Sequence, residues 1–270
     1  MALVSDEAKT QIKAFVEALS SIPDLQFNPD VDPHLLFDPY DRAGTIPSLT
    51  AHYFLLIASV DAGFAIGLPE NARRLGVFLH SKLAEKLFAA TERDFVEFIT
   101  RSGINIASKG QTAKLLADVN SVVRRWGDIS AYASKHSTPT EFADALANEM
   151  PNLGGPHTAR KRIWMYLRWM VRDRPDLRIF HFFHPRQLYV PLDRNVAKVG
   201  VSVGLLHDLS EIAWPQVQKL TEFARSLFPD DPAKVDYPFF LVGREMGRED
   251  LSLSTLLSTI RSLLARHRLS

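Results

Sequence analysis

The sequence contains no cysteine among its 270 residues. A disulfide framework, a thiolate zinc site, an iron–sulfur cluster and a cysteine nucleophile are therefore excluded. We expect no other metal site, because His181 and His184, which could be interpreted as a metal-binding pair, have no apparent third ligand nearby. The start of the chain has no positively charged opening followed by an apolar run, so we expect no signal peptide and an intracellular location, in the cytoplasm or nucleoid.

Long apolar runs are also missing. The most apolar stretch, residues 53–68, is interrupted by Asp61 and two glycines and is shorter than the roughly 20 residues that cross a bilayer, so we expect no membrane partner. Alternation of apolar and polar residues is nearly absent, whereas apolar residues recur at helical spacing. The sequence predicts an all-α fold, with a core that includes Trp126, Trp164, Trp169 and Trp214.

Capping residues mark the ends of several predicted helices. Ser5 or Asp6 can cap a first amphipathic helix, and Thr138 with Glu141 forms a capping box for a later one. The C-terminal helix, residues 249–268, is amphipathic, and we expect it to pack against the first helix. The other helices predicted before residue 150 cover residues 47–67, 69–90, 91–101, 109–126, 128–136 and 139–149, and residues 23–45 form an irregular connector.

The net charge of +1 hides an uneven distribution. Residues 151–200 hold ten basic and three acidic side chains, a local charge of +7, so the other 220 residues carry −6. A basic segment of this kind is expected where a protein meets a phosphate backbone. A solvated basic face is the alternative, and composition alone favours it.

A short glycine-rich turn lies within this basic segment. It separates two predicted helices, as in a helix-hairpin-helix, and Gly154 and Gly155 would let backbone N–H groups approach a phosphate closely. If Thr158 caps the second helix, three consecutive cations occupy its first turn. The interaction of each with the positive end of the helix dipole is unfavourable by about 0.3–1 kcal/mol. Residues placed against a local preference in this way suggest a function.

Two side chains in this region could carry chemistry. Lys161 begins a helix that is apolar nearly all round, and its placement among cations at a helix N-terminus favours the neutral, nucleophilic amine. A surface lysine that contacts phosphate is an equally good interpretation. Asp193 lies 32 residues later at the start of another predicted helix. Taken alone, this position favours a helix-capping role over a catalytic one. Lysine and aspartate at two helix starts can, however, face one cleft.

The hairpin, Lys161 and the later segment Pro191–Asp193 together resemble the helix-hairpin-helix superfamily of DNA glycosylases, in which a catalytic lysine follows the turn and an aspartate begins a later helix. The archaeal 8-oxoguanine DNA glycosylase family (AGOG) is similar in its lysine-to-aspartate interval and in a Pro-Val-Asp segment. Its Asp-x-x-x-Trp-Leu-x-Gly-Arg stretch resembles residues 236–244, with Phe240 in the place of the base-pocket Trp. A mainly bacterial family of uncharacterised relatives is also similar, and the resemblance covers about residues 150–245.

The superfamily fold has two helical subdomains with a cleft between them. By this resemblance, residues 46–175 form a central subdomain that ends in the helix-hairpin-helix, and residues 1–45 and 176–270 combine in the other. Lys161 and Asp193 would then face the cleft from opposite sides. The N-terminal half shows no counterpart of the second stacking Trp of the archaeal family, so the resemblance indicates the class of chemistry better than the damaged base.

The resemblance implies a bifunctional DNA N-glycosylase and abasic-site lyase of base-excision repair, acting on 8-oxoguanine in double-stranded DNA, as a monomer and without a cofactor. Lys161 would attack the sugar as the base departs and form a Schiff base that permits β-elimination, while Asp193 would stabilise the developing positive charge. The expected base-pocket residues are Asp236, Tyr237, Phe239 and Phe240. The expected DNA-binding residues are Gly154, Gly155, His157, Thr158, Arg160 and Arg162.

Two other functions are compatible with the sequence. A non-catalytic helix-hairpin-helix protein would bind DNA with a steep salt dependence and release no base. A helical scaffold would use its basic residues only for solvation and would not bind DNA at low salt.

Overall fold

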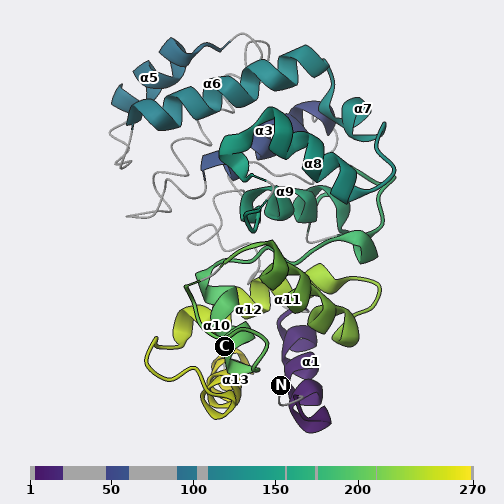
Figure 1. The fold of residues 1–270 in the computed structure, drawn as a ribbon, viewed down its shortest axis with the longest axis vertical. Helices are drawn as coiled ribbons and strands as arrows, with labels where there is room; N and C mark the ends of the chain where they lie inside the picture. The colour runs from purple at the N-terminus through teal and green to yellow at the C-terminus, as the bar shows by residue number, and fades with distance from the viewer. Residues whose placement is uncertain are drawn as a thin grey trace. The chain divides into compact units, whose positions relative to one another are not determined.

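The computed structural model describes residues 4–20, 47–60, 90–101, 109–155, 157–173, 176–210 and 212–268 (Figure 1). Every regular element in these ranges is a helix, and the only pairing of extended backbone among them is an isolated antiparallel bridge between Thr158 and Ala213. The predicted all-α fold is therefore confirmed. No helix in the described ranges is both long and apolar enough to span a bilayer.

The chain packs as two compact units, each built from separate stretches of sequence. The unit that we call terminal comprises Met1–Gln26, Pro156–Trp164 and Pro185–Ser270, and the central unit comprises Phe27–Gly155 and Met165–His184. These boundaries differ from those expected after residues 45 and 175, and the segment that carries Lys161 groups with the two chain ends. The bridge from Thr158 to Ala213 fixes that segment to the terminal unit.

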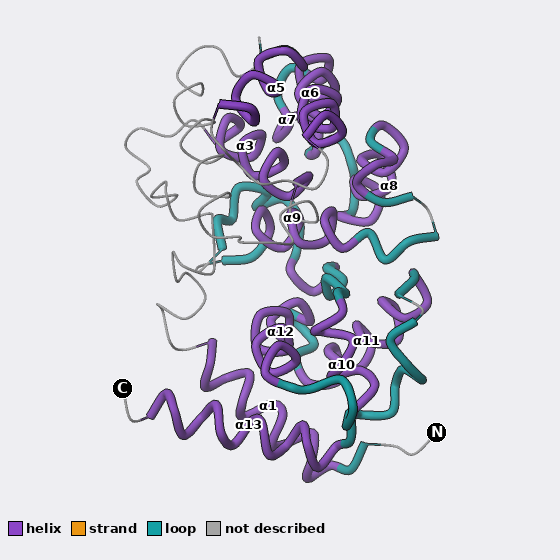
Figure 2. The backbone as a smooth tube through the Cα atoms, turned by 90° about the vertical axis from the view of Figure 1, so that its left-hand side faces the viewer, coloured by secondary structure: helices purple, strands orange, loops and turns teal. Residues whose placement is uncertain are grey.

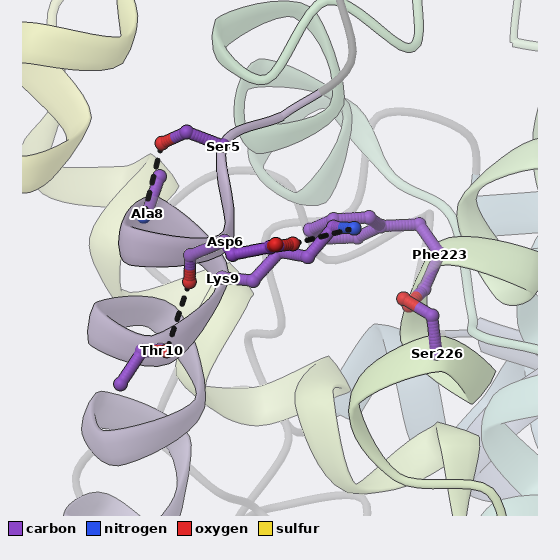
Figure 3. Close-up of polar contacts among 7 residues, drawn as sticks. All are labelled: Ser5, Asp6, Ala8, Lys9, Thr10, Phe223 and Ser226. Carbon is purple, nitrogen blue, oxygen red and sulfur yellow. Dashed lines mark hydrogen bonds and ion pairs between the residues drawn. The ribbon is translucent and has the colours of Figure 1, made fainter.

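The terminal unit begins with α1 (Asp6–Ser20). Ser5 caps this helix, since its Oγ accepts a hydrogen bond from the backbone N–H of Ala8 at 3.2 Å (Figure 3). The apolar face predicted for this helix is fully buried and consists of Ile12, Phe15, Val16 and Leu19. The other α-helices of the unit are α10 (Arg194–Ser202), α11 (Trp214–Leu227), α12 (Asp236–Glu245) and α13 (Leu253–Arg268), with short 3-10 turns at Pro185–Gln187 and Pro232–Val235.

The two ends of the chain pack together, as predicted. α13 lies alongside α1 (Figure 2), and Leu256, Ile260 and Leu263 join the face of α1 in one buried core. Helices α10 and α12 cross at very close range at Gly243, where a Cβ would come within 2.0 Å of the carbonyl oxygen of Asn195. Only glycine permits this approach, so it fixes α12 against the first turn of α10.

The central unit contains α3 (Pro47–Val60), whose residues 51–59 are all buried, as expected for a nearly all-apolar helix. α3 packs against α6 (Lys109–Trp126), which also packs against α5 (Glu92–Arg101). The predicted helix at 69–90, the connector at 23–45 and the end of the predicted helix at 47–67 lie outside the described residues. The remaining helices are α7 (Ile129–Ala133), α8 (Pro139–Glu149), a 3-10 turn at Pro151–Leu153 and α9 (Lys161–Val171), inside which the two units meet in sequence.

The predicted Thr138 cap of α8 is confirmed, but the carboxylate of Glu141 reaches the residue before the cap, so the capping box is not formed in its usual way. The backbone N–H of Glu141 donates to Oγ1 of Thr138 at 3.2 Å, and the carboxylate of Glu141 accepts from the backbone N–H of Ser137 at 2.7 Å. These two bonds satisfy donors at the helix start, so α8 delivers the chain to the hairpin in a fixed direction.

Candidate functional site

The hairpin begins directly after α8. Gly154 has φ 140° and ψ 116°, a conformation open to glycine and strained for other residues. A Cβ at Gly155 would meet nothing within 4 Å, so this second glycine is not required by packing inside the described structure. Both glycines end a segment of the central unit, whereas His157 and Thr158, which are exposed, belong to the terminal unit.

The second helix of the hairpin does not begin where the sequence suggested. Thr158 is not its N-cap, because α9 starts at Lys161 and Thr158 instead pairs with Ala213. The hydroxyl of Thr158 accepts from the backbone N–H of Arg160 at 3.3 Å, which closes a short turn ahead of the helix. A helix capped by Thr158 is not possible here because the backbone of Arg160 is left-handed, with φ 48°, while Ala159 is buried in the core.

Arg160 departs most from its predicted role. Its φ is 48°, a left-handed conformation that costs a non-glycine residue on the order of 1–3 kcal/mol. Its side chain is buried, and the guanidinium lies over the ring of Trp214 at 5.9 Å from the centroid. Arg160 is therefore held inside the terminal unit and not presented at the surface as a phosphate contact. Strained backbone of this kind is concentrated at functional sites, and here it directly precedes Lys161.

Lys161 and Arg162 form the start of α9, and both side chains are half-buried. From Ile163 onward, the helix is buried at every position to Val171 except Arg168, which confirms the expected core helix. Lys161 thus stands where a buried helix reaches the surface.

An aromatic cluster follows Lys161 within the terminal unit. The ring of Trp164 stacks on that of Trp214 with centroids 5.9 Å apart, and Tyr189 lies 4.9 Å from the first and 4.8 Å from the second. Trp164 is buried as predicted, whereas Trp214 is half-buried. The buried indole N–H of Trp164 has no acceptor within the described residues, and an unpaired donor of this kind costs about 1–3 kcal/mol. No local sequence signal identifies this cluster, because its members are far apart in the chain.

Asp193 is the N-cap of α10, as predicted. Its Oδ1 accepts from the backbone N–H of Asn195 at 2.8 Å and from that of Val196 at 2.9 Å. Both bonds go to the same oxygen, and Oδ2 accepts no hydrogen bond from any residue that the structure describes. The carboxylate is half-buried, so capping fixes its orientation and leaves one oxygen for another task.

Lys161 and Asp193 belong to the same compact unit. The sequence placed them on opposite sides of a cleft between subdomains, but packing assigns Pro156–Trp164 and Pro185–Ser270 to the terminal unit together. Their neighbours Ala159 and Leu192 lie in one hydrophobic core, which explains the difference. The two segments are therefore fixed within a single packed body.

Helix α12 carries the residues expected to line a base pocket. Phe239 is only 1% exposed and lies in the core, so its prediction as a stacking surface is wrong. Tyr237 and Phe240 are partly buried at the edge of the same core, and their rings are 6.5 Å apart and nearly parallel, at 22°. Asp236 begins the helix and is buried. Of the four residues, Tyr237 and Phe240 present rings that can reach a ligand.

Part of the charge of residues 151–200 is neutralised inside the fold. The guanidinium of Arg172 contacts the buried carboxylate of Asp176 at 2.6 Å, with Arg168 at 3.6 Å from the same group. Asp173 pairs with Arg178. Both aspartates are already counted in the net charge of +7, so these pairs leave it unchanged, whereas the burial of Arg160 and Lys198 removes two cations from the surface. The cations with exposed or half-buried side chains include Lys161, Arg162, Arg186 and Arg194.

The described residues contain no group of three or more metal-ligating side chains. His181 and His184, which are both exposed, form no such group.

A family model described as a protein of unknown function (DUF2400) matches residues 89–245 of the chain. The match spans α5 to the end of α12 and includes Lys161, Asp193, Tyr237 and Phe240. No curated protein matches the sequence.

Proposed function

The chain belongs to the DUF2400 family, whose function is unknown, and we propose that it is a DNA glycosylase with abasic-site lyase activity. One observation carries the proposal: a single packed unit holds a half-buried lysine at the first residue of α9 and an N-cap aspartate with one carboxylate oxygen unengaged by the described residues. A lysine nucleophile and a fixed carboxylate are the two groups that this chemistry needs.

The lysine supplies the covalent step. Its neutral Nζ forms a bond to C1′ of the damaged nucleotide while the C1′–N bond breaks, and the electron pair leaves with the base, which takes up a proton. Opening of the sugar ring gives a Schiff base. Loss of a C2′ proton then expels the 3′ phosphate and cleaves the strand. Each of these steps needs an amine nucleophile and a proton acceptor.

Asp193 supplies charge stabilisation and proton transfer. With Oδ1 fixed by two backbone N–H groups, Oδ2 is the oxygen that accepts the proton lost from the attacking amine and offsets the positive charge that develops on the sugar. Because the cap already holds the carboxylate, little reorganisation is needed during the reaction.

The remaining groups bind DNA. His157 and Arg162 contact the DNA backbone and the buried Arg160 supports the turn from within, whereas the backbone N–H of Gly154 already donates to the carbonyl oxygen of Pro151 at 3.2 Å. The paired rings of Tyr237 and Phe240 stack on an extruded base, and this stacking offsets the cost of extrusion, a few kcal/mol. We propose 8-oxoguanine in double-stranded DNA as the substrate and a monomer as the active form, in an intracellular role in base-excision repair.

Borohydride trapping tests the proposal. Incubation with duplex DNA that contains 8-oxoguanine or an abasic site, followed by reduction, should give a covalent adduct from the wild type and none from Lys161→Gln. The matched control is Lys219→Gln, which removes an exposed lysine of α11 in the same unit and should trap normally. DNA binding without an adduct from the wild type would overturn the lyase assignment and indicate a non-catalytic DNA-binding protein.

A further inference from the structure

A second feature of the terminal unit lies beside the start of α10. It is a surface cavity of about 360 Å³, within the range of roughly 300–1,000 Å³ that is usual for small-molecule sites. Among the described residues that line it, three are cationic and none carries a carboxylate. The lining residues are Arg194, Asn195, Lys198, Leu209, Ser210 and Arg248, and we call this cavity the Arg248 pocket.

Lys198 is the innermost cation of the pocket, with only 7% of its surface exposed. Its ammonium group donates to the carbonyl oxygens of Gly243 at 2.8 Å and Met246 at 2.6 Å, which leaves one of its three N–H groups for a ligand. Burial lowers the pKa of Lys198, the neighbouring Arg248 lowers it further, and Asp193 opposes both effects. Buried charges are usually paired, yet Lys198 forms no ion pair within the described part of the chain.

Arg194 and Arg248 complete the positive lining and are both exposed. Neither forms an ion pair with a residue that the structure describes. Asp193, whose charge acts on Lys198, forms no ion pair with it and caps α10 through Oδ1. Asp208 accepts hydrogen bonds from Ser210, and Asp250 accepts from Ser252 and Thr255 at the start of α13. The pocket thus gathers three cations whose charges the described carboxylates do not neutralise directly.

We propose that the Arg248 pocket binds a phosphate-bearing ligand of nucleotide size. Arg194, Lys198 and Arg248 hold the phosphate oxygens, because charge-assisted hydrogen bonds from several cations recognise this group. Asn195 and Ser210 offer polar contacts for the rest of the ligand. The nucleotide is either one unit of a DNA strand or a free nucleotide, and the same contacts serve both. The proposal does not depend on the chemistry of Lys161.

Calorimetric titration with deoxyadenosine 5′-monophosphate tests the pocket directly. We expect the wild type to bind the nucleotide and to bind deoxyadenosine much more weakly, and we expect Arg248→Gln and Arg194→Gln each to weaken nucleotide binding by about 10-fold or more. The matched control is Arg261→Gln, which removes an exposed arginine of α13 and should bind as the wild type does. Circular dichroism should show all three variants folded, since the replaced side chains are exposed.

A second titration, with an undamaged duplex, distinguishes the two sources of the phosphate. If the pocket holds a DNA phosphate, the slope of log K against log salt should fall by about one for each arginine removed, relative to Arg261→Gln. A loss confined to the free nucleotide would assign the pocket to that ligand. Equal binding by the pocket variants and the control in both titrations, or equal binding of nucleoside and nucleotide, would overturn the proposal. Neither titration involves base release, so failure of the glycosylase proposal would leave both results interpretable.

Discussion

Replacement of Gly243 by alanine tests the close contact between α10 and α12. The added Cβ would lie 2.0 Å from the carbonyl oxygen of Asn195 and 2.6 Å from its carbonyl carbon, whereas real Cβ contacts are essentially never below 3.0 Å. The obstructing atoms are backbone and cannot rotate away. The two helices must therefore separate by about 1 Å or the first turn of α10 must distort.

The magnitude follows from two opposing effects. Overpacking in a well-packed region costs about 1–3 kcal/mol, and a clash with backbone belongs at or above the upper end of that range. Alanine in a helix is more favourable than glycine by up to about 1 kcal/mol. The net loss in the free energy of unfolding should then be at least about 2 kcal/mol, or roughly 4–8 °C in Tm for a chain of this size.

Thermal unfolding followed by circular dichroism measures this loss. Gly247→Ala is the matched control, because a Cβ at that position meets nothing within 4 Å, and its Tm should stay within about 1 °C of the wild type. A Gly243→Ala protein as stable as the wild type would refute the inferred α10–α12 contact. Since Asn195 also donates to the carboxylate of Asp193, the variant should lose base excision along with stability.

Three further predictions use the same approach. Asp193→Asn should retain the cap and the free energy of unfolding but lose most base excision in a cleavage assay. Asp193→Ala should lose base excision and also about 1 kcal/mol of the free energy of unfolding, measured in urea. Loss of folding by Asp193→Asn would indicate a purely structural carboxylate. Thr138→Ala should cost about 1 kcal/mol, and no change in the urea midpoint would contradict the capping of α8. Burial lowers the pKa of His52 from 6.5 to about 4. As the pH drops from 6.5 towards 4, His52 takes up a proton in the unfolded state but not in the folded state. The free energy of unfolding should therefore fall by about 3 kcal/mol over this range. His52→Leu should reduce this pH dependence in urea unfolding, and an unchanged dependence would exclude His52 as its source.

Features that depend on neighbouring residues could be predicted from the sequence. The Thr138 cap of α8, the cap of α1 at Ser5 and the N-cap role of Asp193 each depend on residues within four positions, and the structure shows all three. The all-α fold and the buried character of α9 follow from apolar periodicity in the same way. These are the parts of the site that local physics determines.

Features that depend on distant residues could not be predicted. Arg160 is buried because Trp214, more than fifty residues later, provides the surface that it covers, and no pattern around Arg160 indicates this. The grouping of Lys161 with both chain ends likewise depends on the bridge to Ala213. Phe239 and Phe240 are a different case, because adjacent residues on a helix point about 100° apart and both could not face the same ligand. Helical geometry could have assigned one of them to the core.

The position of the unit boundary inside α9 limits how this protein can be divided. Each unit consists of more than one stretch of chain, so no single cut in the gene releases either unit whole. A recombination event that carried α9 elsewhere would transfer its first four residues, Lys161–Trp164, without the aromatic partners contributed by residues 189 and 214. Lys161 and the rest of its helix are thus inherited together with both units of the molecule, and the smallest portable piece is nearly the full chain.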